Sequence, residues 1–407
     1  MSFVELNGWY MQLGLRHNWR QFSLLVLVNA FVGGMVGLER SILPQLALQE
    51  FGIASSVAVF SFIVVFGLIK AVSNYYAGHF ANQVGRRKLL ILGWIFAIPI
   101  PFILMWAPSW NWIIAANVLL GLNQGFAWSS TVTMKIDLVG DKNRGLAMGI
   151  NEFAGYISVG LVAFLTGWIA QNYGIRPYPF YIGIAFVGMG LGLSIFFVHD
   201  TQGHVAAAVG ESHVPRLKSI FWETTWADRN LGSITQAGLV NNLNDGMVWG
   251  LFPMLLLSKG FSLAEIGVIT AIYPTVWGLG QLATGKLSDL ICQKDLLTYG
   301  LLLQALALAG LIWAVSFTQF AGLSVLLGLG TAMVYPTFLS AIATHTHPLD
   351  RAKSLGIFRL WRDSGYAVGA LLTGVLSAYF SFSISIASIA GLTVLSAVIV
   401  WKRMRCS

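Results

Sequence analysis

The chain has 407 residues, of which 56% are hydrophobic and only 10% are charged, and its mean hydropathy is +0.72. A soluble protein of ordinary composition carries about 25% charged residues, because its surface must face water. Most of this chain therefore faces lipid. The formal net charge of +8 does not indicate a nucleic-acid partner, because the basic residues follow the membrane topology described below.

Twelve apolar stretches follow one another along the chain. A helix that spans a bilayer needs about 20 mostly apolar residues, and these stretches are too continuous for the alternating strands of a membrane barrel. The first follows Arg16 and Arg20 and has no small-residue cleavage site after it, so we expect a retained helix. The predicted helices are 22–44, 56–78, 89–107, 112–134, 146–170, 178–198, 231–257, 264–286, 297–316, 321–343, 354–379 and 384–401.

The distribution of Lys and Arg predicts the orientation, because these residues concentrate in cytoplasmic loops. With the N-terminus inside, eighteen of them fall in inside segments, and only Arg176 and Lys259 fall in outside loops. We therefore expect both termini in the cytoplasm and the protein in the cell's inner membrane. Cys292 and Cys406 fall in predicted cytoplasmic segments, so we expect no disulfide framework.

An internal repeat with an offset of 207 residues organises the chain. The sequence VLLGL at 118–122 reappears at 325–329, and Gly149 corresponds to Gly356. Parallel repeats of this kind place the substrate near the midplane, between the halves. The predicted organisation is an N-terminal six-helix half (1–198), a cytoplasmic linker (199–230) that tethers the halves, and a C-terminal six-helix half (231–407).

Two short loops occupy matching places in the repeat. The loop after the second predicted helix reads GHFANQVGRRK from Gly78 to Lys88, and its counterpart reads GKLSD from Gly285 to Asp289. The first resembles the signature loop of the major facilitator superfamily: a Gly, three residues, an acid, Arg, any residue, Gly and two basic residues. Together with the six-plus-six helices, the resemblance covers the whole chain. It implies an all-α transporter with two pseudo-symmetric bundles, and no enzyme.

The resemblance also implies roles for loop residues, whose charges in the family hold the halves together when the protein is open outward. Arg86 would pair with Asp137, and Asp289 would lie at the N-terminal end of the fifth helix, where the dipole favours an anion. Asn82 replaces the acid of the first copy, which weakens its charge network. Alternatively, the basic residues only anchor the topology. The gating-loop candidates are Gly78, Asn82, Gly85, Arg86, Arg87, Asp137, Gly285 and Asp289.

Two elements of drug antiporters in this superfamily are missing. These proteins carry an Arg three residues before a Gln-Gly pair in the fourth helix. Here Gln124 and Gly125 are present, but the Arg position is Gly121. The fifth helix also lacks the family's Gly-Pro element, since 155–167 contains no proline. Multidrug efflux by proton antiport is therefore not indicated by motif.

Ionisable side chains inside a membrane are costly and mark candidate sites. Eight fall within predicted helices: Glu39, Arg40, Lys70, Glu152, Asp245, Arg359, Arg362 and Asp363. Lys70 and Asp363 lie at similar depth, and the resemblance implies that their helices meet, so we hypothesise an ion pair between the halves. Arg40 and Asp245 form a second hypothetical pair. The alternative in each case is a static salt bridge.

Polar groups in two helices suggest a site for the solute. Arg359 and Arg362 suit a carboxylate or phosphate, although snorkelling towards headgroups is an equal alternative. Asn242 and Asn244, with Asn241, form a polar patch beside Asp245, for which hydrogen-bonded helix packing is the alternative. A carboxylate that can release its proton in one state of the transport cycle, such as Glu39 or Asp245, would suffice for proton coupling.

These features predict a secondary active transporter for a small polar or anionic organic solute, coupled to protons and expected to be a monomer in contact with membrane lipid. Efflux of drug-like or toxic amphipathic compounds is the alternative, and a sensor that does not transport is a third class. We expect no cofactor, metal or nucleic acid. A near match to a nucleotide-binding loop at 280–286 ends in Leu287 and closes a membrane helix. His345 and Asp350 give only weak support to an enzyme.

Overall fold

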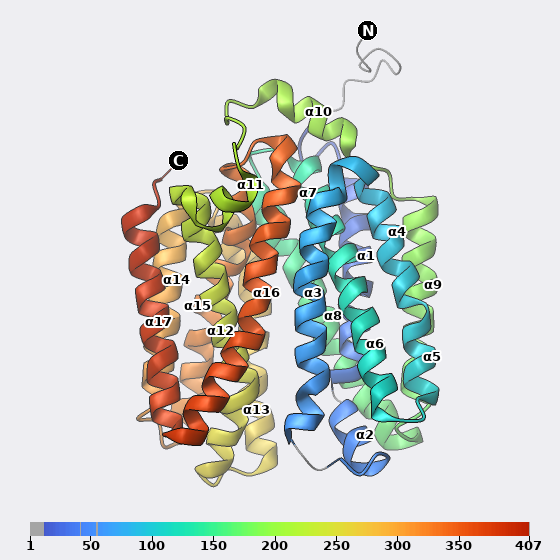
Figure 1. Ribbon diagram of the computed structural model, residues 1–407, viewed down its shortest axis with the longest axis vertical. Coiled ribbons are helices and arrows are strands. Elements are labelled where there is room, and N and C mark those ends of the chain that lie inside the picture. Colours follow the sequence, from blue (N-terminus) through green and yellow to red (C-terminus); the bar gives the residue numbers. More distant parts are fainter. Residues whose placement is uncertain (1–11, 41, 54–55, 407) are drawn as a thin grey trace.

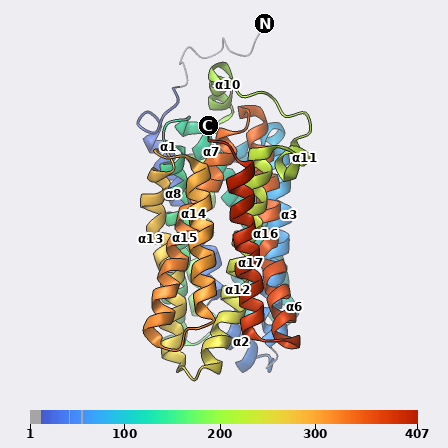
Figure 2. The same cartoon turned by 90° about the vertical axis from the view of Figure 1, so that its left-hand side faces the viewer.

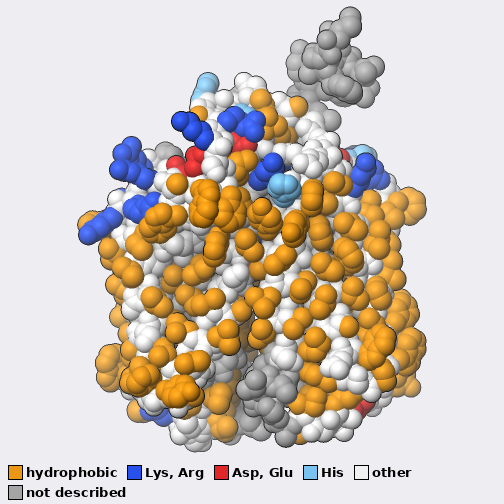
Figure 3. All heavy atoms as spheres, in the orientation of Figure 1, with side chains coloured by type: hydrophobic (Ala, Val, Ile, Leu, Met, Phe, Trp, Pro, Cys, Tyr) orange, Lys and Arg blue, Asp and Glu red, His pale blue; other side chains and the backbone are white. Residues whose placement is uncertain are grey.

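Long helices that run side by side form most of the described part of the molecule (Figure 1, Figure 2). The computed structural model describes residues 12–40, 42–53 and 56–406. Nine helices in this part of the chain are long and apolar enough to cross a membrane. Apolar side chains cover most of the face in Figure 3, whereas Lys and Arg gather at the end where both termini lie.

The N-terminal bundle contains six membrane-length segments, several of which are broken into shorter helices. Residue 41, inside the first predicted span, lies outside the described residues. The elements are α1 (Trp19–Arg40), α2 (Leu43–Gln49), α3 (Ser56–Val84), α4 (Arg86–Ala97), α5 (Pro99–Trp106), α6 (Trp110–Asn123), the π-helical turn η1 (Gln124–Trp128), α7 (Ser129–Val139), α8 (Arg144–Tyr173), the 3-10 turn η2 (Tyr178–Phe180) and α9 (Tyr181–Phe196).

The C-terminal bundle has six unbroken helices. They are α12 (Arg229–Ser258), α13 (Leu263–Leu287), α14 (Gln293–Leu311), α15 (Phe317–Thr344), α16 (Pro348–Tyr379) and α17 (Phe382–Arg403). The twelve-helix fold predicted from the sequence is therefore confirmed. Segment 110–139, α12 and α16 complete the twelve beside the nine most apolar spans. The first is interrupted by η1, and the other two carry polar residues that lower their hydropathy.

The connection between the bundles crosses the end where the termini lie (Figure 1). It contains α10 (Gln202–Glu211), α11 (Ile220–Trp222) and the π-helical turn η3 (Glu223–Ala227). Arg216 Nη2 lies 2.6 Å from Asp350 Oδ1 in the first turn of α16. The Arg403 guanidinium lies 4.0 Å from the ring centre of Trp226. The connection is thus fastened to α16 and to the end of α17.

Glycines allow the bundles to touch at this same end. A β-carbon on Gly78 of α3 would lie 2.8 Å from Gly356 Cα of α16, and one on Gly285 of α13 would lie 2.9 Å from Gly149 Cα of α8. Backbones approach this closely only where small residues face each other. The two crossings involve residues at equivalent positions of the 207-residue repeat, so the same contact is made twice.

A disulfide joins Cys292 to Cys406, and the expectation of no disulfide is therefore wrong. The two residues are 114 positions apart in the sequence. Cys292 precedes α14 and Cys406 follows α17, and these helices pack against each other. The packing of one helix on the other brings the sulfur atoms together, and the linear order of the chain does not reveal it.

Candidate functional site

Charged side chains meet where the bundles touch. Glu152 of α8 and Arg359, Arg362 and Asp363 of α16 are at most 3% exposed. Arg359 Nη2 lies 4.0 Å from Glu152 Oε1, and Arg362 Nη2 lies 2.7 Å from Asp363 Oδ1. The first pair runs between bundles, and the second stays within α16. Both Arg residues face the protein interior, so the alternative of snorkelling to the headgroups does not describe this conformation.

Hydrogen bonds from several helices support these charges. Glu152 Oε1 accepts from Trp128 Nε1 at 3.2 Å and from Asn151 Nδ2 at 2.6 Å. Arg359 Nη1 donates to Ser129 Oγ at 2.9 Å, and Ser129 Oγ donates to Asn74 Oδ1 at 2.5 Å. Such bonds offset the cost of removing ions from water. The network therefore links α3, α7 and α8 of one bundle to α16 of the other.

Lys70 is not the ion-pair partner of Asp363 in this conformation. Asp363 accepts from Arg362 Nε at 2.8 Å and from Asn74 Nδ2 at 2.6 Å. The Lys70 ammonium instead lies over the rings of Phe66 and Trp128, 5.7 and 5.6 Å from their centres. The prediction that α3 and α16 meet here was right, but Asn74, one turn beyond Lys70, makes the contact.

Arg40 and Asp245 also have separate partners. The Arg40 guanidinium lies 5.2 Å from the ring centre of Phe66, whereas Asp245 accepts a hydrogen bond from Tyr273 Oη. The predicted pair is therefore wrong for this conformation, because each residue is engaged within its own bundle. Glu39, which is fully buried, accepts from Asn117 Nδ2 at 3.1 Å.

The asparagines of α12 divide into two groups. Asn244 Nδ2 donates to Gln304 Oε1 at 2.7 Å, and Asn244 Oδ1 accepts from Thr393 Oγ1 at 2.8 Å, so this residue joins α12 to α14 and α17. Asn241 accepts from Gln304 Nε2 at 3.0 Å. Hydrogen-bonded helix packing, the alternative to a solute site, therefore describes Asn241 and Asn244. Asn242 faces α16, where a β-carbon on Gly365 would lie 2.9 Å from Asn242 Cβ.

An aromatic cluster that was not predicted from the sequence lies at the bundle interface. Tyr156 of α8 lies between Trp128 and Trp277, with ring centres 5.5 and 4.2 Å away, and Tyr156 Oη is 2.8 Å from Tyr335 Oη. Tyr273 stacks on Trp277 at 5.9 Å. One signal was available: Tyr precedes Pro inside both α13 and α15, at 273–274 and 335–336.

The first gating loop is built around Arg86, at the start of α4. Its Nε donates to Asp137 Oδ2 at 3.1 Å, and both side chains are almost fully buried. This is the contact that the resemblance implies. Thr201 Oγ1 donates to the same carboxylate oxygen at 2.7 Å. Gly85, with φ of 96°, takes a backbone conformation that favours glycine, and Arg87 hydrogen-bonds to the last carbonyls of α9.

The two loops contact the opposite bundle differently. Asp289 accepts from the backbone N–H groups of Gly145 and Leu146 at 2.7 and 3.0 Å, at the N-terminal end of α8. This is the position that the resemblance implies, where exposed N–H groups and the helix dipole favour an anion. Asn82 instead donates to the carbonyl of Leu349 at 2.7 Å. One contact uses a carboxylate, and the other uses a neutral amide.

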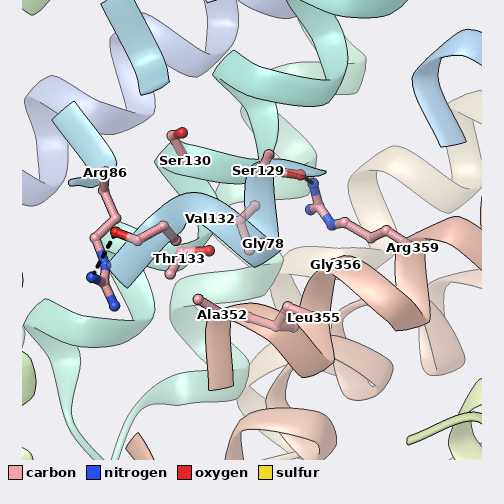
Figure 4. Close-up of a pocket in the computed structure, with 12 residues that line it drawn as sticks. Gly78, Arg86, Ser129, Ser130, Val132, Thr133, Ala352, Leu355, Gly356 and Arg359 are labelled. Atoms are coloured by element: carbon pink, nitrogen blue, oxygen red, sulfur yellow. Dashed lines mark hydrogen bonds between the residues drawn. The ribbon is translucent and has the colours of Figure 1, made fainter. Parts of the chain in front are cut away.

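A small cavity lies beside these contacts (Figure 4). Arg359 enters from one side and Arg86 from the other, with Ser129, Ser130 and Thr133 between them. Its volume of about 10 Å³ is enough for one water molecule. No organic solute fits there in this conformation, in which the Gly78–Gly356 crossing forms one wall.

Possible metal ligands are few. Among the described residues, Cys292, Asp295 and Cys406 alone form a group whose ligand atoms lie within 4.8 Å of one another. The two sulfur atoms of this group are bonded to each other. A thiolate is the form of cysteine that binds a metal, so the group does not offer its sulfur ligands in this form.

Two bundles of membrane-length helices, with ionic groups buried where they meet, define a membrane transporter rather than an enzyme. The sequence profile of the Major Facilitator Superfamily matches residues 24–239 and 234–405. The chain belongs to this family.

Individual relatives are distant. The proton-coupled antiporter flippase LtaA of Staphylococcus saprophyticus is 21% identical over 88% of this chain and 86% of its own length. The multidrug resistance protein MdtG of Yersinia enterocolitica is 22% identical over 90% and 88%. The crystal structure of the human organic anion transporter MFSD10 superposes with a TM-score of 0.77 at 16% identity, and covers 94% of this chain and 99% of that one. These similarities support the fold.

Proposed function

We propose that this protein carries a small polar or anionic organic solute by alternating access, coupled to protons, as a monomer surrounded by lipid. The charge balance at the bundle interface carries the proposal. Four cations lie in or beside this interface with three carboxylates: Lys70, Lys135, Arg359 and Arg362 with Glu152, Asp245 and Asp363. A surplus of cations in a buried region favours a negatively charged solute. The names of two similar proteins, a proton-coupled antiporter and an organic anion transporter, are in keeping with it.

The site residues follow from this proposal. Arg359, Arg362 and Lys70 would bind the anion, and Asp363 would keep Arg362 in place. The gating loops, with Arg86, Asp137 and Asp289, would close one end of the path. Rocking of one bundle on the other would then expose the site alternately to the two sides.

We propose the boundaries 1–198, 199–230 and 231–407, with both termini in the cytoplasm of a cell whose inner membrane holds the protein. Lys and Arg gather at the end of the molecule where Figure 1 marks the termini, which supports this orientation (Figure 1, Figure 3). Single cysteines placed at exposed Gln202 and Lys259 in a chain lacking Cys292 and Cys406 test it. We expect an impermeant maleimide to label the Lys259 position in whole cells and the Gln202 position only after lysis. The opposite pattern would invert the topology.

Asp245 and Glu39 are our candidates for the proton-coupling residue, because both are fully buried carboxylates held by neutral donors. We expect Asp245→Asn to abolish accumulation driven by a pH gradient while solute exchange at equal pH persists, since exchange needs no net proton movement. Proteoliposomes report both rates. Asp141→Asn, at an exposed loop position, is the control. Unchanged gradient-driven accumulation in Asp245→Asn would remove it as a candidate and leave Glu39→Gln to be tested.

Efflux of amphipathic compounds is the second candidate, favoured by the similarity to MdtG. Proteoliposomes with an imposed pH gradient separate it from uptake, because the direction of accumulation relative to the gradient differs. They also identify a sensor, which would bind its solute without flux. We expect flux that collapses when an ionophore dissipates the gradient. Flux unaffected by the ionophore would contradict proton coupling.

A further inference from the structure

The aromatic cluster continues from bundle to bundle, beginning at a cation. The Lys70 ammonium lies 5.6 Å from the ring centre of Trp128. The ring of Tyr156 lies 5.5 Å from that of Trp128 and 4.2 Å from that of Trp277. Lys70, Trp128 and Tyr156 belong to the N-terminal bundle, and Trp277 belongs to α13 of the C-terminal bundle. The Tyr156–Trp277 contact is thus a ring contact between the two moving parts.

The cluster ends at a second cation. Tyr335 lies 4.9 Å from Trp277 between ring centres, and the Arg362 guanidinium lies 5.1 Å from the ring centre of Tyr335. Both rings are only 1% exposed. A ring face carries a partial negative charge that attracts cations. The interface therefore presents aromatic faces with a positive group at either end.

The two cations differ in their partners. Arg362 is neutralised by Asp363, 2.7 Å away. Of the nearby carboxylates, Glu152 receives hydrogen bonds from Trp128 and Asn151, and Asp245 receives one from Tyr273. Asp363 and Glu152 act on Lys70 only through space, and no carboxylate of the described residues lies within 4.0 Å of its ammonium. Lys70 is thus the cation that can accept a further anion.

Donor groups beside the cluster also lack partners. Trp277 Nε1 and Arg359 Nε are buried and have no hydrogen-bond partner among the described residues. A buried donor without a partner loses the hydrogen bonds that water gave it, which is costly unless a ligand or water supplies an acceptor. Trp277 thus offers a ring face and an N–H group in the same position.

We propose that the transported solute is a planar aromatic or conjugated carboxylate. Its ring inserts between Tyr156 and Trp277, and its carboxylate binds the Lys70 ammonium. In the present conformation the rings of Tyr156 and Trp277 contact each other, so each covers the face on which a solute would stack. When the bundles rock apart, the rings separate, and a flat solute stacks on both, because offset and tilted ring contacts of this kind are favourable. This inference rests on the proposed function and narrows its solute class.

Three probes of similar size test the proposal. Benzoate has the ring and the charge, cyclohexanecarboxylate has the charge without the aromatic ring, and benzamide has the ring without the charge. Binding to purified protein in lipid nanodiscs is measured by calorimetry at neutral pH. We expect benzoate to bind about tenfold more tightly than cyclohexanecarboxylate, which corresponds to a single good ring contact. We expect a similar advantage over benzamide, because a charged hydrogen bond is roughly twice as strong as a neutral one.

Variants assign each preference to its residue. We expect Lys70→Gln to abolish the preference for benzoate over benzamide, and Lys70→Arg to keep it. We expect Trp277→Leu to abolish the preference for benzoate over cyclohexanecarboxylate. The matched controls are Lys259→Gln and Trp313→Leu, at exposed positions outside the interface. Both controls should leave the ratios unchanged. Each interface variant should keep the preference assigned to the other residue, which shows that it binds as a folded protein.

Three results would overturn the solute class. The first is equal binding of benzoate and cyclohexanecarboxylate to the unaltered protein, and the second is an undiminished preference for benzoate over benzamide in Lys70→Gln. The third is absence of benzoate binding from a protein that transports another solute in proteoliposomes. A failure of the proposed function looks different: benzoate would bind with the expected preferences, but labelled benzoate would not cross the membrane of proteoliposomes.

Discussion

Substitution of Gly356 by Val is expected to lower transport at least about tenfold, because added side-chain volume in a tight helix contact forces backbones apart. A β-carbon at this position would lie 2.8 Å from the carbonyl oxygen of Asn74 and 3.0 Å from Gly78 Cα. The variant could not close the end of the molecule where the termini lie. Solute exchange in proteoliposomes measures the loss, and an alkylating probe directed at a cysteine placed at Ser129 measures the opening.

The same helix supplies the control. No atom of the described residues lies within 4 Å of the place where a β-carbon on Gly374 of α16 would lie, so Gly374→Val changes volume and helix propensity without a clash. We expect it to transport nearly as well as the unaltered protein. The second crossing allows an independent test in α8. Gly149→Val is the variant at the crossing, and Gly160→Val is its control. Equal losses in a variant and its control would show that the crossings are not needed for closure.

Arg86→Gln is expected to destabilise the N-terminal bundle strongly. Among the described residues, the substitution leaves the buried carboxylate of Asp137 with Thr201 as its remaining side-chain donor. Removing one partner of a buried ion pair costs about 3–5 kcal/mol, mostly because the other charge stays in a poorly solvated place. Thermal unfolding of the purified protein in detergent, followed by intrinsic fluorescence, should show a midpoint well below that of the unaltered protein.

The double variant gives this prediction its control. Arg86→Gln with Asp137→Asn removes both charges, so we expect it to unfold at a higher temperature than Arg86→Gln alone. Lys88→Gln removes a neighbouring positive charge that is exposed to solvent, and we expect little change from it. If the double variant were less stable than the single one, the pair would not act through the buried charge.

The helices were predictable because lipid imposes a simple rule on composition. Each of the twelve apolar runs falls on helical segments, although three runs in the N-terminal half are interrupted, and even α12 and α16 were recognisable despite their polar residues. The repeat with an offset of 207 residues predicted that the chain consists of two similar six-helix halves. The sequence could not show that Gly78 faces Gly356, since the repeat relates each glycine to a copy in the other bundle and not to its neighbour in space.

The sequence predicted how deep the charged residues of the candidate site lie in the membrane, but not which way their side chains face. Lys70 and Asp363 do lie on facing helices, but depth along a helix leaves its rotation undetermined, and Asn74 takes the contact with Asp363. Arg362, adjacent in sequence, completes the pair. The aromatic cluster was missed because Trp and Tyr are apolar enough to look like ordinary membrane residues, and their meeting depends on the packing of α8, α13 and α15.

The contacts of Asp289 and Asn82 differ, so the two loops hold the closed end together with different strength. The Asp289 contact is the stronger one and the Asn82 contact is the weaker one. On the α8–α13 side, a charged group receives two main-chain donors, and those donors belong to the backbone, so few substitutions at 145 and 146 could delete them. On the α3–α16 side, the loop contributes one neutral bond, from Asn82 to Leu349, and the Asn74–Asp363 bond lies more than one turn further into the membrane. At the loops, separation should therefore start between α3 and α16, with α8 and α13 as the pivot.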